Sequence, residues 1–138
     1  MMDGAAQILQ IRYCPKFKWE DTLLFAGSRD EIESLRSFFH EWSGDELDLI
    51  EYLRRQVTVH LFSVSALFLR RDIEQDCFVW DRGKGTWSIS EAHQEKIVSL
   101  LDGLVKGHTA GHQYLEGGGA TVQIMVSRDE NYPLPEVE

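Results

Sequence analysis

Apolar residues dominate two stretches near the start of the chain, residues 6–14 and 19–27, and charged or polar residues interrupt both. Short apolar stretches that contain β-branched and aromatic residues are typical of strands. A segment containing Pro15 separates the two stretches. The pattern therefore predicts an antiparallel hairpin.

The apolar spacing changes to that of a helix after Ser28. Ser28 and Glu31 have the spacing of a capping box, in which the two residues satisfy backbone and side-chain groups at a helix start. We expect this helix to end at Gly44. Its apolar stripe, which faces the core, comprises Ile32, Leu35, Phe38, Phe39 and Trp42.

The pattern in the middle of the chain predicts mainly strands. Residues 46–53 fit both alternation and a helical face, and we favour a strand there. Residues 57–69 are rich in β-branched and aromatic residues, which predicts one long strand or two strands broken near residues 63–66. Residues 77–90 place two aromatic runs around the glycines of DRGKG, which predicts a tight hairpin.

A second helix is predicted over residues 91–106. Ser90 is a suitable N-terminal cap, and Gly107 follows the last helical residue. Its apolar face comprises Ile97, Leu100, Leu101, Leu104 and Val105.

Two short strands, residues 112–116 and 121–126, complete the predicted elements, and a triple glycine joins them. The order of elements predicts a single α+β domain over residues 1–138, with a mostly antiparallel β-sheet and two helices packed on one face. Residues 129–138 are polar and contain prolines, so we expect a mobile C-terminal tail.

Composition narrows the classes of function. The 138 residues include 23 acidic and 14 basic side chains, and the net charge of −9 disfavours nucleic acid as a partner and favours a basic protein. Two cysteines, Cys14 and Cys77, are too few for a disulfide framework, so we expect free thiols. No long apolar run suggests a membrane segment, and we expect a cytoplasmic protein.

The histidines give no evidence for a metal or catalytic site. His108 and His112 are four residues apart, but the glutamate of the zinc-protease pattern is absent beside His108. In a strand, His112 and Glu116 would lie about 13 Å apart, which is too far for direct proton transfer. We therefore expect no metal, no cofactor and no catalytic residue, with His112 and Tyr114 on one face of a strand.

Acidic residues crowd the segment after the first helix. Such a cluster attracts a basic partner and raises its association rate, because surface charge acts before contacts form. The predicted partner-binding residues are Asp45, Glu46, Asp48 and Glu51.

The C-terminal sequence GHQYLE, followed by TVQIMVSRDE and NYP, resembles the C-terminal signature of small bacterial proteins of the polymorphic-toxin immunity type. The resemblance implies a small acidic α+β protein, monomeric or homodimeric, that binds and neutralises a cognate toxin without catalysis. It also implies that His112 and Tyr114 fix the last pair of strands. The matching positions are His112, Tyr114, Leu115, Ser127, Glu130, Tyr132 and Pro133, with Asn131 inserted before Tyr132.

Two alternatives stay open. One is a small hydrolase in which His112 acts with Glu116 or Tyr114 in a cleft that supplies a distant carboxylate or serine. The other is a structural module that self-associates through an edge strand.

Overall fold

Two β-sheets and three helices make up the part of the chain that the computed structural model describes, residues 8–17, 20–73, 76–107, 110–115 and 122–129. In chain order the elements are β1 (Ile8–Phe17), β2 (Glu20–Gly27), α1 (Arg29–Glu41), β3 (Leu47–Asp48), α2 (Leu49–Leu53), β4 (Thr58–Phe62), β5 (Ala66–Arg71), β6 (Cys77–Asp81), β7 (Lys84–Ile89), α3 (Glu91–Lys106), β8 (Gly111–Tyr114) and β9 (Gln123–Arg128).

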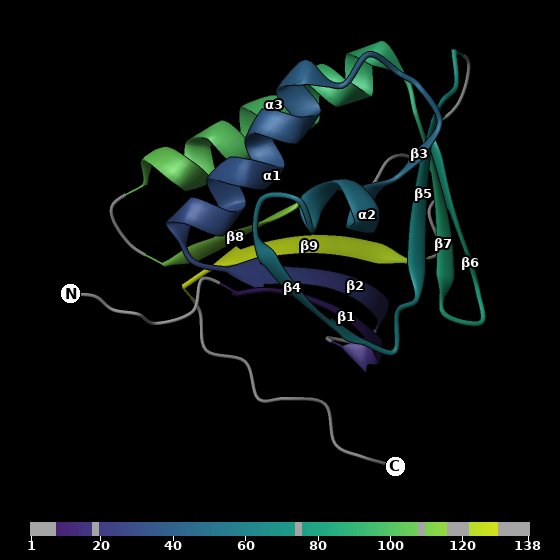
Figure 1. The fold of residues 1–138 in the computed structure, drawn as a ribbon, viewed down its shortest axis with the longest axis horizontal. Helices are drawn as coiled ribbons and strands as arrows, with labels where there is room; N and C mark the ends of the chain where they lie inside the picture. Colours follow the sequence, from purple (N-terminus) through teal and green to yellow (C-terminus); the bar gives the residue numbers. More distant parts are fainter. Residues whose placement is uncertain (1–7, 18–19, 74–75, 108–109, 116–121, 130–138) are drawn as a thin grey trace.

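The strands form sheet A, in the order β4-β1-β2-β9-β8, and sheet B, in the order β3-β5-β7-β6. Helices α1 and α3 lie side by side over one face of sheet A, and sheet B stands at one end of it (Figure 1). The predicted α+β class is confirmed. Four of the seven described strand pairings are antiparallel, but the strands form two mixed sheets, and α2 is a third, short helix.

The predicted N-terminal hairpin and first helix are confirmed. Strand β1 pairs antiparallel with β2. At the start of α1, the backbone N–H of Ser28 donates to Oε1 of Glu31 over 2.8 Å, and the Ser28 hydroxyl donates to the same oxygen over 2.6 Å. The helix ends at Glu41, slightly before the expected Gly44. Gly44 instead turns the chain with φ +100°, where an added Cβ would lie 2.9 Å from Nε of Arg71.

The strand favoured for residues 46–53 is wrong for most of its length, because only Leu47–Asp48 is extended and Leu49–Leu53 is helical. Asp48 explains the change, since its carboxylate accepts from the backbone N–H of Ile50 over 3.0 Å and caps α2. The helix buries Leu49, Ile50 and Leu53, which share the helical rather than the alternating pattern.

The later elements follow the sequence prediction closely. Residues 57–69 form two strands, broken at Ser63, whose φ is +63°. The β6–β7 hairpin turns at Arg82 and Gly83, with φ of +52° and +87°, as a tight two-residue turn requires. Helix α3 has the predicted bounds, and the hydroxyl of Ser90 accepts from the backbone N–H of His93 over 3.1 Å.

The last two strands pair antiparallel, as predicted. Their connection, residues 116–121, and the predicted tail, apart from Asp129, lie outside the described residues. Arg128 at the end of β9 binds the C-terminus of α3, because its Nη1 donates to the carbonyl oxygen of Leu104 over 3.0 Å. A cation at this end of a helix is favoured by the helix dipole.

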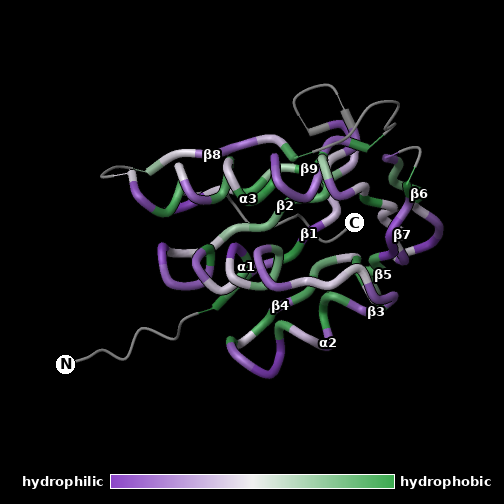
Figure 2. Tube along the Cα trace, turned by 90° about the horizontal axis from the view of Figure 1, so that it is seen from above, coloured by the Kyte–Doolittle hydropathy of each residue, from purple (hydrophilic) through white to green (hydrophobic). Residues whose placement is uncertain are grey.

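Aromatic contacts join the layers of the core. The Phe39 ring of α1 meets Trp87 of β7 edge to face, with centroids 5.7 Å apart, so α1 packs against sheet B as well as sheet A. Tyr13 of β1 stacks on Trp80 of β6 with centroids 4.1 Å apart and fixes the two sheets to each other. Figure 2 shows hydrophobic residues along the strands of sheet A, beneath helices whose outward turns are hydrophilic.

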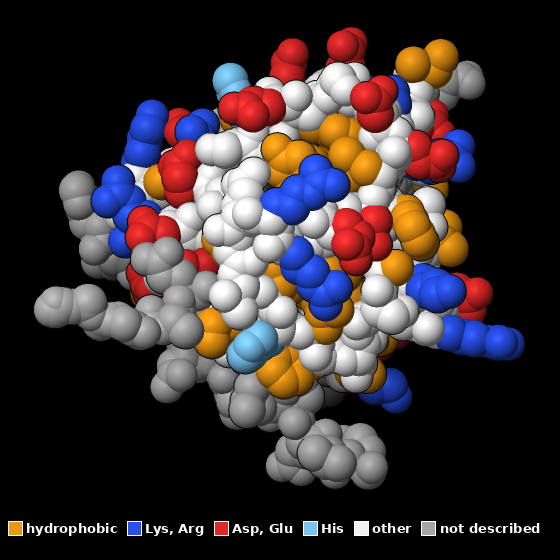
Figure 3. All heavy atoms as spheres, in the orientation of Figure 1, with side chains coloured by type: hydrophobic (Ala, Val, Ile, Leu, Met, Phe, Trp, Pro, Cys, Tyr) orange, Lys and Arg blue, Asp and Glu red, His pale blue; other side chains and the backbone are white. Residues whose placement is uncertain are grey.

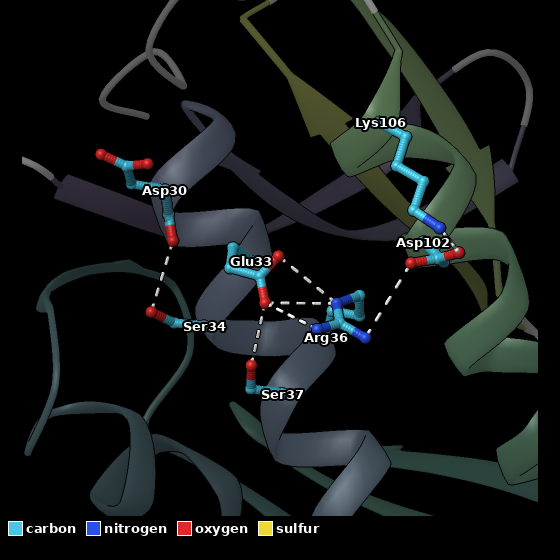
Figure 4. Close-up of polar contacts among 7 residues, drawn as sticks. All are labelled: Asp30, Glu33, Ser34, Arg36, Ser37, Asp102 and Lys106. Atoms are coloured by element: carbon cyan, nitrogen blue, oxygen red, sulfur yellow. Dashed lines mark hydrogen bonds and ion pairs between the residues drawn. The ribbon is translucent and has the colours of Figure 1, made fainter.

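The outer surface of the helix pair carries a polar cluster (Figure 4). Arg36 donates to Glu33 over 2.8 Å and lies 3.9 Å from Asp102 of α3, which also binds Lys106. The hydrogen bond from Arg36 lowers the pKa of Glu33 below its ordinary value. Because these side chains are partly exposed, the cluster contributes only about 0.5 kcal/mol per pair.

Candidate protein-binding surface

The face of sheet B that points away from the core carries exposed hydrophobic side chains. Phe68 of β5, Thr86 of β7 and Val79 of β6 lie in one cross-strand row, with Asp48 of β3 beside Phe68. Phe68 is 39% exposed and Val79 is 58% exposed. Hydrophobic side chains are visible on this side of the molecule in Figure 3. We call this face the sheet B patch.

Charged residues surround the sheet B patch. Arg70 lies two residues beyond Phe68 on β5. Lys84 of β7 lies opposite Asp81 of β6 in the strand register, at the end of the β6–β7 hairpin. All three side chains are exposed. An apolar centre with a charged rim is the usual composition of a surface that binds another protein.

Three of the four predicted acidic residues are exposed to solvent, and all four lie close to β3 along the chain. Asp45 and Glu46 precede β3, the strand that pairs with β5 beside Phe68. Glu51 on α2 is exposed, and one of its oxygens lies 3.5 Å from Arg54. Asp48 differs because it is half-buried, and its Oδ1 accepts from the backbone N–H groups of Ile50 and Leu67. Asp48 therefore holds α2 and β5 in place.

The signature residues lie far from the sheet B patch, on sheet A. The rings of His112 and Tyr114 meet edge to face with centroids 5.5 Å apart on one face of β8. Ser127, opposite His112 on β9, is fully buried. Leu115 is buried, and its carbonyl oxygen lies 2.9 Å from Nε2 of His93 on α3. Glu130, Tyr132 and Pro133 lie outside the described residues.

A hollow of about 420 Å³ opens where α1, α3 and β5 meet. Arg71 lines this hollow, with its guanidinium 4.7 Å from the centroid of the Trp42 ring. Arg71 donates to the carbonyl oxygen of Ile89, and Gln94 donates to that of Trp42 over 2.9 Å. Arg71 also donates to Oε1 of Gln94, so this network joins the ends of α1 and α3 to sheet B. The lining residues, which do not include His112, are Phe39, His40, Trp42, Ser43, Arg71, Glu91, Gln94, Glu95 and Val98.

Three consecutive residues of β1 carry perturbed titratable groups. Burial raises the pKa of Tyr13 to about 12, and the hydrogen bond from its hydroxyl to Asp21 adds to this effect. Burial lowers the pKa of Arg12, and burial raises the pKa of the Cys14 thiol against the attraction of Arg12. Both cysteines are free thiols, as predicted. None of these groups lies on the sheet B patch.

Within the described ranges, no three His, Cys, Asp or Glu side chains are grouped so that they could hold a metal ion. The helices described here are all too short or too polar to cross a lipid bilayer. Comparisons with protein-family models, with curated proteins and with solved structures found no match.

The exposure of Phe68 could not be predicted from the sequence. Residues 57–69 form a nearly continuous apolar run, and such a run does not show which of two alternating faces meets the core. The structure assigns Leu67 and Leu69 to the core and leaves Phe68 outside.

Proposed function

We propose that this protein is a non-enzymatic protein-binding domain of the immunity type, which binds and neutralises a basic bacterial toxin. The observation that supports this most strongly is the exposed row of Phe68 and Val79, beside the segment that carries Asp45 and Glu46. The proposal also rests on the resemblance of the C-terminal signature to immunity-type proteins.

The two parts of this surface have different physical roles in the proposal. The exposed apolar side chains lose water on contact, and such residues at the centre of an interface supply most of its binding free energy. The acidic side chains attract a basic partner before contact, which raises the association rate in a salt-dependent manner. The net charge of −9 acts in the same direction.

The first experiment is a pull-down from the cell that produces the protein, with this protein as bait at low salt and a second wash at high salt. The expected result is a stoichiometric basic partner that inhibits growth when it is expressed alone and is harmless when co-expressed with the bait. A partner that the bait binds but does not neutralise would contradict the immunity function and leave a binding module.

Substitutions then test the apolar part and the acidic part of the surface one at a time. Phe68→Ser with Val79→Ser is expected to weaken binding at least about tenfold, mainly through faster dissociation. Asp45→Lys with Glu46→Lys is expected to slow association about tenfold at low salt, with little effect at high salt. Glu91→Lys with Glu95→Lys is the matched control, because these exposed residues lie on α3.

Unchanged binding in both surface variants would show that the surface is assigned wrongly. Light scattering of the purified protein tests the alternative of self-association. A stable dimer that Val79→Lys converts to monomer would show that the sheet B patch binds a second copy of the chain, in place of a toxin.

A further inference from the structure

Strand β6 forms one end of sheet B, and its outer edge is open. The order of strands places β6 beside β7 alone, and no described helix or strand lies beyond it (Figure 1). Within the described residues, the ladder hydrogen bonds of β6 therefore run only to β7. An open edge presents backbone N–H and C=O groups that can pair with another strand.

The β6–β7 turn determines which groups of β6 face this edge. Its two central residues have positive φ, so Asp81 and Lys84 flank a two-residue turn and form a hydrogen-bonded pair across it. Hydrogen-bonded and non-hydrogen-bonded pairs alternate along an antiparallel ladder. Every second residue, from Asp81 back to Cys77, therefore bonds to β7, and the backbone groups of Phe78 and Trp80 point outward.

The side chains of β6 do not protect its edge from pairing. Val79, at the centre of the strand, is 58% exposed. The strand sequence CFVWD contains no proline or lysine, and its register with β7 has no bulge. These are the features with which proteins usually protect an open edge. Three of the five residues instead have high strand propensity.

The other strands at the ends of the two sheets are less suited to pairing. Strand β3 has only two residues, and β8 has four and begins with Gly111. Strand β4 has five residues, but its central residue is the polar His60. Of the described edges, β6 therefore has the one apolar, exposed centre.

The sequence of β6 is complementary to itself in antiparallel orientation. A twofold axis through Val79 pairs all five residues of the strand without an overhang and places Cys77 opposite Asp81. Just beyond the strand ends, Asp76 of one copy then comes close to Arg82 of the other, whose side chain is 94% exposed. Opposite charges therefore meet at both ends, and no two like charges lie opposite each other in this register.

The same register satisfies the outward backbone groups. Phe78 of one copy lies opposite Trp80 of the other, and each of these two symmetry-related pairs forms two backbone hydrogen bonds. Val79 then lies opposite Val79 of the second copy in a non-hydrogen-bonded pair, whose Cα atoms are about 4.5 Å apart. In this arrangement the two exposed valines cover each other.

We propose that two copies of the chain pair antiparallel through β6, with the twofold axis at Val79, so that their two B sheets form one continuous sheet. The rows of Phe68, Thr86 and Val79 from both copies then join into a single row. This contact uses the edge of sheet B and leaves its outer face open. The inference therefore goes beyond toxin binding, because the homodimer presents two adjacent sheet B patches.

A register-specific disulfide tests this pairing in the full-length chain. Asp81→Cys places a thiol opposite Cys77 of the other copy, in a non-hydrogen-bonded pair whose Cα separation suits a disulfide. Within one chain, positions 77 and 81 are about 13 Å apart, which is too far for a disulfide. Oxidation with copper phenanthroline should therefore give a covalent dimer, and mass spectrometry should identify the link between positions 77 and 81. The control, Asp81→Cys with Cys77→Ser, should give no dimer linked through position 81.

Sedimentation equilibrium of the wild type measures the dimer without a covalent link. The mass should rise with protein concentration from 15.9 kDa toward twice that value. Arg82→Glu should weaken the dimer about tenfold at low salt, because two symmetry-related contacts with Asp76 change from attraction to repulsion. Arg70→Glu, at an exposed residue of β5 away from the edge, is the matched control and should not weaken the dimer.

Phe68→Ser separates pairing at the edge from contact through the sheet B patch. Phe68 lies on β5, two strands from the edge, so edge pairing should persist in this variant. Val79→Lys would dissociate both kinds of dimer and does not distinguish them. The proposal would be overturned by loss of the dimer in Phe68→Ser, by a monomer at every concentration up to millimolar, or by equal linking through position 81 in the control.

Discussion

Sheet A and sheet B each have one face that no described helix covers, and the two faces differ in composition and exposure. On the face of sheet A that points away from α1 and α3, which we call the helix-free face, Arg12, Leu24 and Met125 are each at most 3% exposed. On the sheet B patch, Phe68 and Val79 are 39% and 58% exposed. The face with the buried Arg12 is closed to water, and the face with Phe68 and Val79 is open to it.

This difference shows that the absence of a helix does not define a binding surface. A charged residue enters a buried layer at a cost that its partners must offset, and Arg12 has such partners within the chain, Gln10 among them. Exposed apolar side chains lower the free energy only when something binds them, so Phe68 and Val79 indicate a partner that arrives from outside. The helix-free face is thus part of the folded interior, and the sheet B patch suggests external binding.

The largest expected effect comes from comparing alanine substitutions on the two faces. Leu24→Ala should lower the free energy of unfolding by about 2–4 kcal/mol, because it leaves a cavity at a buried position. Phe68→Ala removes a larger side chain but should cost less than about 1 kcal/mol, because Phe68 is already partly in water. Urea unfolding of both variants measures the difference.

If Leu24→Ala and Phe68→Ala lowered the free energy of unfolding equally, the distinction between the two faces would be wrong. A loss below about 1 kcal/mol for Leu24→Ala would mean that the helix-free face is accessible to water in solution. Phe68→Ala then serves as the internal reference, since both residues lie on strands paired on both sides.

A smaller effect is expected from His60 and His112, which lie at the two ends of one cross-strand row of the helix-free face. His112→Ala should destabilise the protein by about 1–3 kcal/mol, because His112 is half-buried and loses its interaction partner. His60→Ala, at the exposed opposite edge, should change stability by less than about 0.5 kcal/mol. Thermal and urea unfolding give both values.

The same pair of variants tests the enzymatic alternative. A hydrolase that uses His112 would lose turnover in His112→Ala while its melting temperature stayed almost unchanged. Because His112 lies on β8 with Tyr114 against its ring, the expected result is the reverse, a loss of stability.

Elements that depend on local signals could be predicted from the sequence. Ser28 and Ser90 mark both long helices correctly, because a capping side chain acts on backbone groups within the next three residues. Gly83 likewise marks the β6–β7 turn, where the backbone needs positive φ. These signals involve neighbours in the chain, so no knowledge of distant contacts was needed.

Features that depend on distant contacts could not be predicted. Strand β9 lies parallel to β2, which pairs Thr22 with Gln123, and no local pattern specifies a partner so far along the chain. The sequence indicates only the charge of Asp48, because its capping bond to Ile50 depends on the fold around α2. In the candidate site, the acidic residues followed from charge alone, while the exposure of Phe68 required the sheet register.

The smallest expected effect is a pH dependence at Cys14, the residue that follows Arg12 on the helix-free face. Burial raises the pKa of this thiol above its ordinary value of 9.0, and Arg12 opposes the shift. A raised folded-state pKa stabilises the fold fully below the unfolded pKa, and this contribution is lost as pH rises through the folded value. The free energy of unfolding should therefore fall more steeply above pH 9.0 in the wild type than in Cys14→Ser.

The alkylation rate of Cys14 as a function of pH gives the folded-state pKa of this thiol directly. The Cys77→Ser variant is used, because Cys14 is then the single thiol. A midpoint above 9.0 is expected, because burial penalises the thiolate more than the nearby guanidinium stabilises it. A midpoint below 9.0 would show that the attraction of Arg12 prevails, as it does when water reaches the thiol. The comparison between the two faces would then fail at its chemical basis, because a helix-free face that water reaches would be as open as the sheet B patch.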